Sequence, residues 1–117
     1  MENGGKMNSE VAQVRQEGEA KVVEVHGEVD MHRSPELHQL LRDICEERPA
    51  KLVVDLSRVD YMDSSGIGTL VEIFRRVKGF EGQMVLVSLQ PRVRGVFEIT
   101  KLDKFFSIHD SVAEALR

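Results

Sequence analysis

The side chains best suited to chemistry are concentrated in residues 55–68, which read DLSRVDYMDSSGIG. Within this stretch, Asp63 precedes two adjacent serines, and glycines follow at positions 66 and 68. An acid beside a hydroxyl could serve nucleophilic or phosphoryl chemistry. The same residues are also good N-caps for a helix, and the glycines would allow tight packing against it. The residue types alone therefore leave a functional and a purely structural interpretation open.

The catalytic motifs that this stretch could represent are incomplete. The phosphate-binding string G-x-x-x-x-G-K-[ST] does not occur, and Gly66-x-Gly68 lacks the third glycine of a dinucleotide fingerprint because position 71 is Val. A serine nucleophile would need a G-x-S-x-G elbow or a positioned His–Asp pair, whereas Ser64 follows Asp63. The histidines show no metal-ligand spacing. The sequence therefore predicts no catalytic residue, no metal site and no cofactor.

Strand patterns surround the polar stretch. Two strands, 11–16 and 21–29, are predicted on either side of a turn at 17–19. In the second, the alternating residues Val23, Val25, Gly27 and Val29 should face inward. Short apolar strands are expected at 52–56, 83–89 and 105–108.

Helices are predicted between these strands, over residues 34–48, 65–78, 91–100 and from 110 to the C-terminus. Ser34 would be the N-cap of the first helix, and Asp110 would cap the last. The order β-β-α-β-α-β-α-β-α predicts an α/β layered domain. Its sheet should be mixed and mostly parallel, with helices packed on it.

Composition limits the function classes. A chain of 117 residues has room for one domain, which we expect to follow a flexible leader over residues 1–10. The net charge of −4 and the lack of Trp disfavour nucleic-acid binding. The longest apolar runs, such as residues 84–87, are too short for a membrane span, and the first ten residues contain no signal-peptide core. With its single cysteine, Cys45, the chain is expected to be cytoplasmic.

Four short segments of the sequence resemble those of the bacterial anti-sigma factor antagonists, which are the single-domain form of the STAS fold. They are GEVD at 27–30, SPEL at 34–37, VVDLS at 53–57 and YMDSSGIG at 61–68. The similarity spans residues 11–117, which would make this range a STAS domain. Within that context, D-S-S-G-[IL]-G is a specific signal.

The resemblance implies a phosphorylation-controlled binding module that is not an enzyme. Members of the family bind an anti-sigma factor, typically a serine kinase, and thereby release a sigma factor. They are switched off when the kinase phosphorylates the second serine of the motif, here Ser65, and a serine phosphatase would reverse this step. The resemblance places Asp30, Asp63, Ser64 and Gly66 at the partner surface.

Electrostatics supports such a switch independently of the resemblance. A phosphate on Ser65 would lie in the first turn of a helix, where free N–H groups and the helix dipole favour an anion, so the fold should survive. It would add about −1.5 to −2 charges beside Asp63 and weaken binding to a partner that fits neutral serine. The Ser65 hydroxyl should then face solvent, while Ser64 makes turn or capping bonds. Asp30 is either a turn residue or a partner contact.

Two other function classes stay open. The same domain could sense a ligand or serve in a larger signalling or transport assembly. A small phosphotransferase or nucleotide hydrolase could use Asp30 and Asp63 as metal ligands, but the missing phosphate cradle makes this the weakest alternative.

Overall fold

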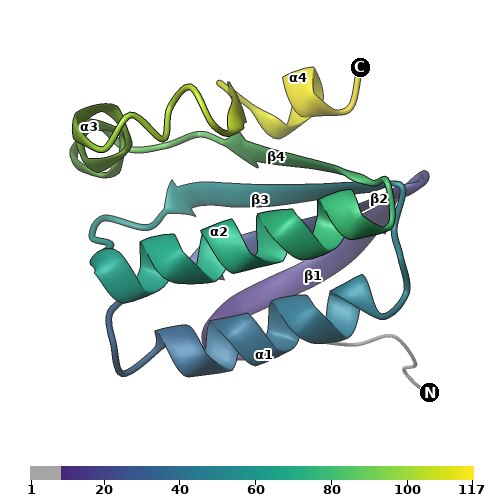
Figure 1. The fold of residues 1–117 in the computed structure, drawn as a ribbon, viewed down its shortest axis with the longest axis horizontal. Coiled ribbons are helices and arrows are strands. Elements are labelled where there is room, and N and C mark those ends of the chain that lie inside the picture. The colour runs from purple at the N-terminus through teal and green to yellow at the C-terminus, as the bar shows by residue number, and fades with distance from the viewer. Residues whose placement is uncertain (1–8) are drawn as a thin grey trace.

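A five-stranded sheet with strand order β1-β2-β3-β4-β5 forms the frame of the structure (Figure 1). The structure is a computed structural model that describes residues 9–117. β1 (Ala12–Glu17) and β2 (Ala20–His26) are antiparallel, and β3 (Lys51–Arg58), β4 (Gln83–Val87) and β5 (Ser107–His109) continue the sheet in parallel. The predicted mixed, mostly parallel sheet is confirmed. The predicted leader, 1–10, lies mostly outside the described residues.

The helices alternate with the strands in the predicted order. α1 (Ser34–Cys45) and α2 (Ser64–Gly79) lie side by side on one face of the sheet (Figure 1). α3 (Pro91–Ile99) follows β4, and the short α4 (Val112–Ala115) packs on the opposite face against β3, β4 and β5. None of the helices within residues 9–117 is long and apolar enough to cross a membrane.

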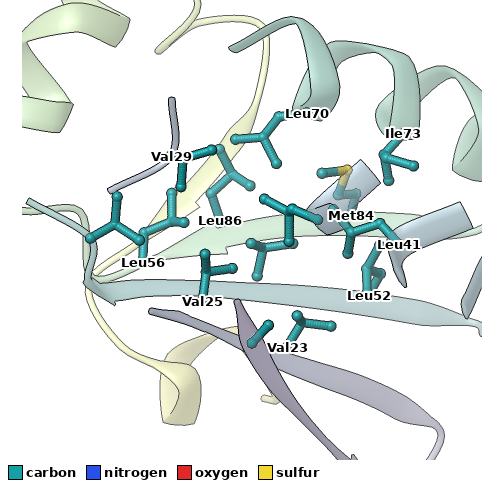
Figure 2. Packing of buried hydrophobic residues seen from close by; sticks show 14 of the residues in the cluster. Val23, Val25, Val29, Leu41, Leu52, Leu56, Leu70, Ile73, Met84 and Leu86 are labelled. Carbon is teal, nitrogen blue, oxygen red and sulfur yellow. The ribbon is translucent and has the colours of Figure 1, made fainter. Parts of the chain in front are cut away.

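The core consists of two layers, one on each face of the sheet. The larger layer joins the sheet to α1 and α2, and it includes Val23, Val25, Leu41, Leu52, Leu56, Leu70, Ile73, Met84 and Leu86 (Figure 2). The smaller layer lies under α4 and consists of Val22, Val53, Val85, Val87 and Ala115. The central strands are therefore covered on both faces, which explains their nearly continuous apolar sequence.

The second strand ends three residues earlier than predicted. Gly27 has φ of +80°, in the left-handed region that glycine tolerates, and it turns the chain out of β2. Val29 remains buried, but it forms an isolated parallel bridge with Met62 outside the sheet. The alternating pattern therefore identified Val29 as a core residue and placed it in the wrong element.

Both predicted helix caps are wrong. The N-cap of α1 is Arg33, and Ser34 is already inside the first turn because its N–H donates to the Asp30 carbonyl at 2.8 Å. The N-cap of α4 is Ser111, whose hydroxyl accepts the N–H of Glu114 at 3.1 Å. Ser111 and Glu114 have the spacing of a capping box, a signal that the sequence does contain.

Candidate functional site

Residues 59–63 of the polar stretch connect the carboxyl end of β3 to the start of α2, and they lie against the loop between β2 and α1. The N–H of Val29 donates to the Tyr61 carbonyl at 2.9 Å, and the N–H of Asp63 donates to the Val29 carbonyl at 3.1 Å. These two bonds bring the Asp30 loop to the start of α2. The carboxyl ends of parallel strands are where functional groups gather in α/β folds.

Asp63 is the N-cap of α2. One of its oxygens, Oδ1, accepts the backbone N–H of Ser65 at 2.9 Å and of Gly66 at 3.4 Å. The same oxygen accepts the Ser65 hydroxyl, with 2.6 Å between Oγ and Oδ1. Asp63 therefore supplies the cap of α2 and also orients the Ser65 hydroxyl.

The predicted roles of the two serine hydroxyls are reversed. Ser65 is half-buried, and its hydroxyl is bonded to Asp63. The exposed Ser64 makes no hydrogen bond through its hydroxyl to another residue in 9–117. The physical reason is that Asp63 already occupies the N-cap, so its carboxylate, and not Ser64, satisfies the first N–H groups of the helix.

The carboxyl group of Asp63 has a pKa below its ordinary value. The hydroxyl of Ser65 has the largest influence, because it donates to the charged form; partial burial opposes it. Backbone N–H groups of Ser65, Gly66 and Met31 lower this pKa further. The site therefore presents a carboxylate beside the serine at neutral pH.

Replacing Ser65 by Ala should raise the pKa of Asp63 toward its ordinary value, because the strongest donor to the carboxylate is lost. A depressed native pKa stabilises the fold above the unfolded pKa, and this contribution disappears as pH falls through the native pKa. The stability difference between wild type and Ser65→Ala should accordingly be present at pH 7 and disappear in acid. Carboxyl-carbon NMR titration measures the pKa, with Ser64→Ala as the control that leaves it unchanged. An Asp63 titration unaffected by Ser65→Ala would contradict this geometry.

Asp30 has the structural role that one of the two interpretations gave it. Its Oδ1 accepts the backbone N–H groups of His32 at 3.0 Å and Arg33 at 3.1 Å, closing the turn before α1. Asp30 is half-buried. The turn lies at the start of α2, because the N–H of Asp63 donates to the carbonyl of Val29, the residue before Asp30, at 3.1 Å. A partner contact by Asp30 remains a prediction.

Gly66 is buried at the point where the two loops approach each other. A Cβ at this position would lie 2.7 Å from Cγ of Met62, 2.8 Å from Cγ1 of Val29 and 3.1 Å from the Val29 carbonyl oxygen. A Cβ at Gly68 would meet nothing within 4 Å. The close-packing role suggested by the two glycines thus applies to Gly66.

Two exposed apolar side chains flank the site and were not singled out from the sequence. Met31 is 68% exposed and Tyr61 is 39% exposed. Tyr61 is exposed and the next residue, Met62, is buried, as alternation in an extended segment requires. In the sequence, each of the two exposed residues directly follows an acid of a predicted loop, Asp30 and Asp60.

The two carboxylates that the enzymatic alternative would use are engaged by N–H donors. Within residues 9–117, no group of three or more His, Cys, Asp or Glu side chains is arranged to hold a metal ion.

Comparison with known proteins identifies similar sequences and folds. The family model of the STAS domain matches residues 11–115. Over 90 residues, the chain is 32% identical to the "Anti-sigma-B factor antagonist" of Listeria monocytogenes, covering 77% of this chain and 79% of the relative. A solved anti-sigma factor antagonist from Mycobacterium paratuberculosis has a TM-score of 0.83 at 30% identity, covering 90% of this chain and 89% of that one.

One further solved structure has the same fold at lower identity. It is the Bacillus cell fate determinant SpoIIAA in its phosphorylated form, with a TM-score of 0.71 at 22% identity, covering 90% of this chain and 96% of that one. Together these matches confirm the predicted STAS fold and the resemblance to anti-sigma factor antagonists.

Proposed function

The chain belongs to the STAS domain family, and from this premise we propose that it is an anti-sigma factor antagonist whose binding is controlled by phosphorylation of Ser65. Its partner would be an anti-sigma factor with serine kinase activity, and unphosphorylated Ser65 would permit the binding that releases a sigma factor. A serine phosphatase would restore the active form. The name of the Listeria relative supports the role of antagonist.

The observation that carries the proposal is the hydrogen bond between Ser65 Oγ and Asp63 Oδ1, at 2.6 Å. Phosphorylation removes the hydroxyl proton that makes this bond and replaces it with a dianionic group. The new charge lies beside a carboxylate that is already ionised, so the local field changes strongly. A phosphate at the first turn of α2 is favoured by the helix dipole. The effect of the phosphate should therefore fall on the partner interface more than on the fold.

The proposed partner surface is formed by the two loops and the start of α2. Asp30, Asp63 and Ser64 would provide polar contacts, and Met31 and Tyr61 would provide apolar ones. Gly66 would support this surface indirectly, because its lack of a side chain allows Val29 and the Asp30 loop to lie close to α2. An apolar pair within a polar, acidic surface is typical of a protein interface with a few dominant side chains.

The experiment that tests the proposal combines binding and phosphate mapping. The purified chain would be incubated with a candidate anti-sigma factor kinase, ATP and Mg²⁺, and the modified residue identified by mass spectrometry. We expect one phosphate, on Ser65, and a complex that forms only with the unmodified chain. Phosphate on Ser64, or on no residue of this loop, would refute the assignment. ATP hydrolysis by the chain alone would favour the enzymatic alternative.

Truncating Met31 should weaken the complex without changing the fold. Burying an exposed methionine side chain in an interface contributes about 1–2 kcal/mol, so Met31→Ala should lower partner affinity about tenfold. Ile99→Ala is the matched control, since Ile99 is 84% exposed on α3 and outside the proposed surface. Isothermal titration calorimetry gives both affinities. Equal effects of the two substitutions would argue against this surface.

A further inference from the structure

Arg33 connects three segments that are separate in the sequence. Its Nη2 donates to the carbonyl oxygens of Glu10, at 3.2 Å, and of His26, at 3.1 Å. The first carbonyl precedes β1 and the second ends β2. The guanidinium group lies over Gly27, where a Cβ would be 3.5 Å from Nη2. The side chain therefore fastens the start of α1 to the edge of the sheet.

The backbone of Arg33 closes the turn that faces the candidate site. Its N–H donates to Asp30 Oδ1 and to the Asp30 carbonyl, each at 3.1 Å. In the same loop, the carbonyl of Val29 accepts the N–H of Asp63 at 3.1 Å, and the Asp63 carboxylate accepts the Ser65 hydroxyl. The loop that Arg33 fastens to the sheet edge is therefore bonded directly to the residue that orients Ser65.

The side chain of Arg33 is not optimised for stability. Its Nε is buried and has no hydrogen-bond partner among residues 9–117. A buried donor without an acceptor is unfavourable, and natural structures contain few of them. The guanidinium therefore makes its two carbonyl bonds through Nη2 in an arrangement that leaves Nε unpaired, so its role is the link between these segments.

We propose that Arg33 is a positioning residue that holds the loop of residues 27–33 against the start of α2 and so fixes the partner surface around Ser65. Its Nη2 reaches two carbonyls at once, which a shorter or apolar side chain cannot do. The proposed effect of Arg33 on the hydrogen bonds of this loop follows from the geometry alone. The effect on partner affinity rests on the function proposed above.

The test compares three variants of the full chain by amide hydrogen exchange. Arg33→Met keeps an unbranched stem and has no donor, Arg33→Lys keeps a donor, and Arg42→Met changes an exposed arginine in the last turn of α1. In Arg33→Met, exchange of the backbone amides at positions 32 and 33, which bond to Asp30 Oδ1, should accelerate at least about tenfold. Arg33→Lys should restore part of the protection, and Arg42→Met should have no effect.

Amides in the interior of α1, such as those of Leu41 and Ile44, report on the fold and should keep their protection. The pKa of Asp63, which the Ser65 hydroxyl lowers most and the Met31 N–H lowers as well, should rise in Arg33→Met. Unchanged exchange of the amides at positions 32 and 33 would overturn the proposal. Equal acceleration throughout α1 would also overturn it, because Arg33 would then serve global stability.

Partner affinity provides the functional measurement. We expect Arg33→Met to bind the anti-sigma factor about tenfold more weakly than wild type, with Arg33→Lys intermediate. Loop exchange that accelerates while affinity stays unchanged would overturn the link to the partner surface. If wild type itself binds no such partner, the proposed function fails, and the exchange experiment still decides whether Arg33 positions the loop.

Discussion

Phosphorylation of Ser65 should lower the affinity for the anti-sigma factor at least about a hundredfold, which corresponds to roughly 2.7 kcal/mol. The phosphate places nearly two negative charges beside the Asp63 carboxylate, which is bonded to the Ser65 hydroxyl at 2.6 Å in the unmodified chain. A partner surface that fits a neutral hydroxyl would then bury these negative charges, at the cost of their mutual repulsion and of the water removed from the phosphate. Calorimetry on the phosphorylated and unmodified chains measures the difference.

Substitutions at the two serines separate charge from position. Ser65→Ala should abolish phosphorylation and still bind, giving a permanently active antagonist. Ser65→Asp should fold, since an acid is tolerated in the first helical turn, and should bind weakly with an effect smaller than that of the phosphate. Ser64→Ala should leave phosphorylation intact and change stability by less than about 0.5 kcal/mol, because its hydroxyl caps nothing. Unchanged affinity in Ser65→Asp would refute the electrostatic explanation.

Gly66→Ala should destabilise the protein and Gly68→Ala should not. At position 66 a methyl group would overlap Met62 and Val29, at 2.7 and 2.8 Å, and the stiff Val29 side chain and its carbonyl have little room to yield. Overpacking of this kind costs about 1–3 kcal/mol and outweighs the gain of about 1 kcal/mol in helix propensity. We expect the free energy of unfolding to fall by up to about 2 kcal/mol, while partner binding weakens because the Asp30 loop is displaced.

Gly68→Ala is the matched control for this effect. Position 68 is in the same helix, and a methyl group there meets nothing within 4 Å. Only the higher helix propensity of Ala relative to Gly remains, so the free energy of unfolding should rise by about 0.5–1 kcal/mol. Urea denaturation of both variants measures the difference. If Gly66→Ala proved as stable as Gly68→Ala, the close approach of the two loops would be disproved.

Local patterns predicted most of the fold because they reflect local physics. The apolar spacing in α1 and α2 and the continuous apolar runs of β3 and β4 each describe one element and its burial. The errors were of two kinds: the helix caps depended on the exact register of a single turn, and the end of the second strand depended on a nonlocal contact. Ser34 is a good cap by type, but the Asp30 carbonyl already bonds its N–H. Val29 fits a strand by pattern, and only its pairing with Met62 shows that it stands outside the sheet.

The position of the candidate site in the fold was predictable from the sequence, but the hydrogen bonds within the site were not. The motif located Ser65 and Asp63, and the strand order brought the Asp30 loop to the same edge. Which serine hydroxyl bonds to Asp63 depends on helix register, and the sequence contains three acceptable caps in a row. The contact of Arg33 with Glu10 and His26 joins parts of the chain 23 and 7 residues apart, so no local pattern indicates it.

The assignment of the α2 cap to Asp63 has a consequence for the rate of the proposed switch. Since neither serine hydroxyl caps the helix, modification of Ser65 leaves the capping carboxylate in the chain, and no element has to melt and form again. Slow conformational steps of the kind that limit many regulatory proteins would then be absent. The time needed to turn the antagonist off and on would be determined by the turnover of its kinase and phosphatase, and the same molecule could pass through many cycles.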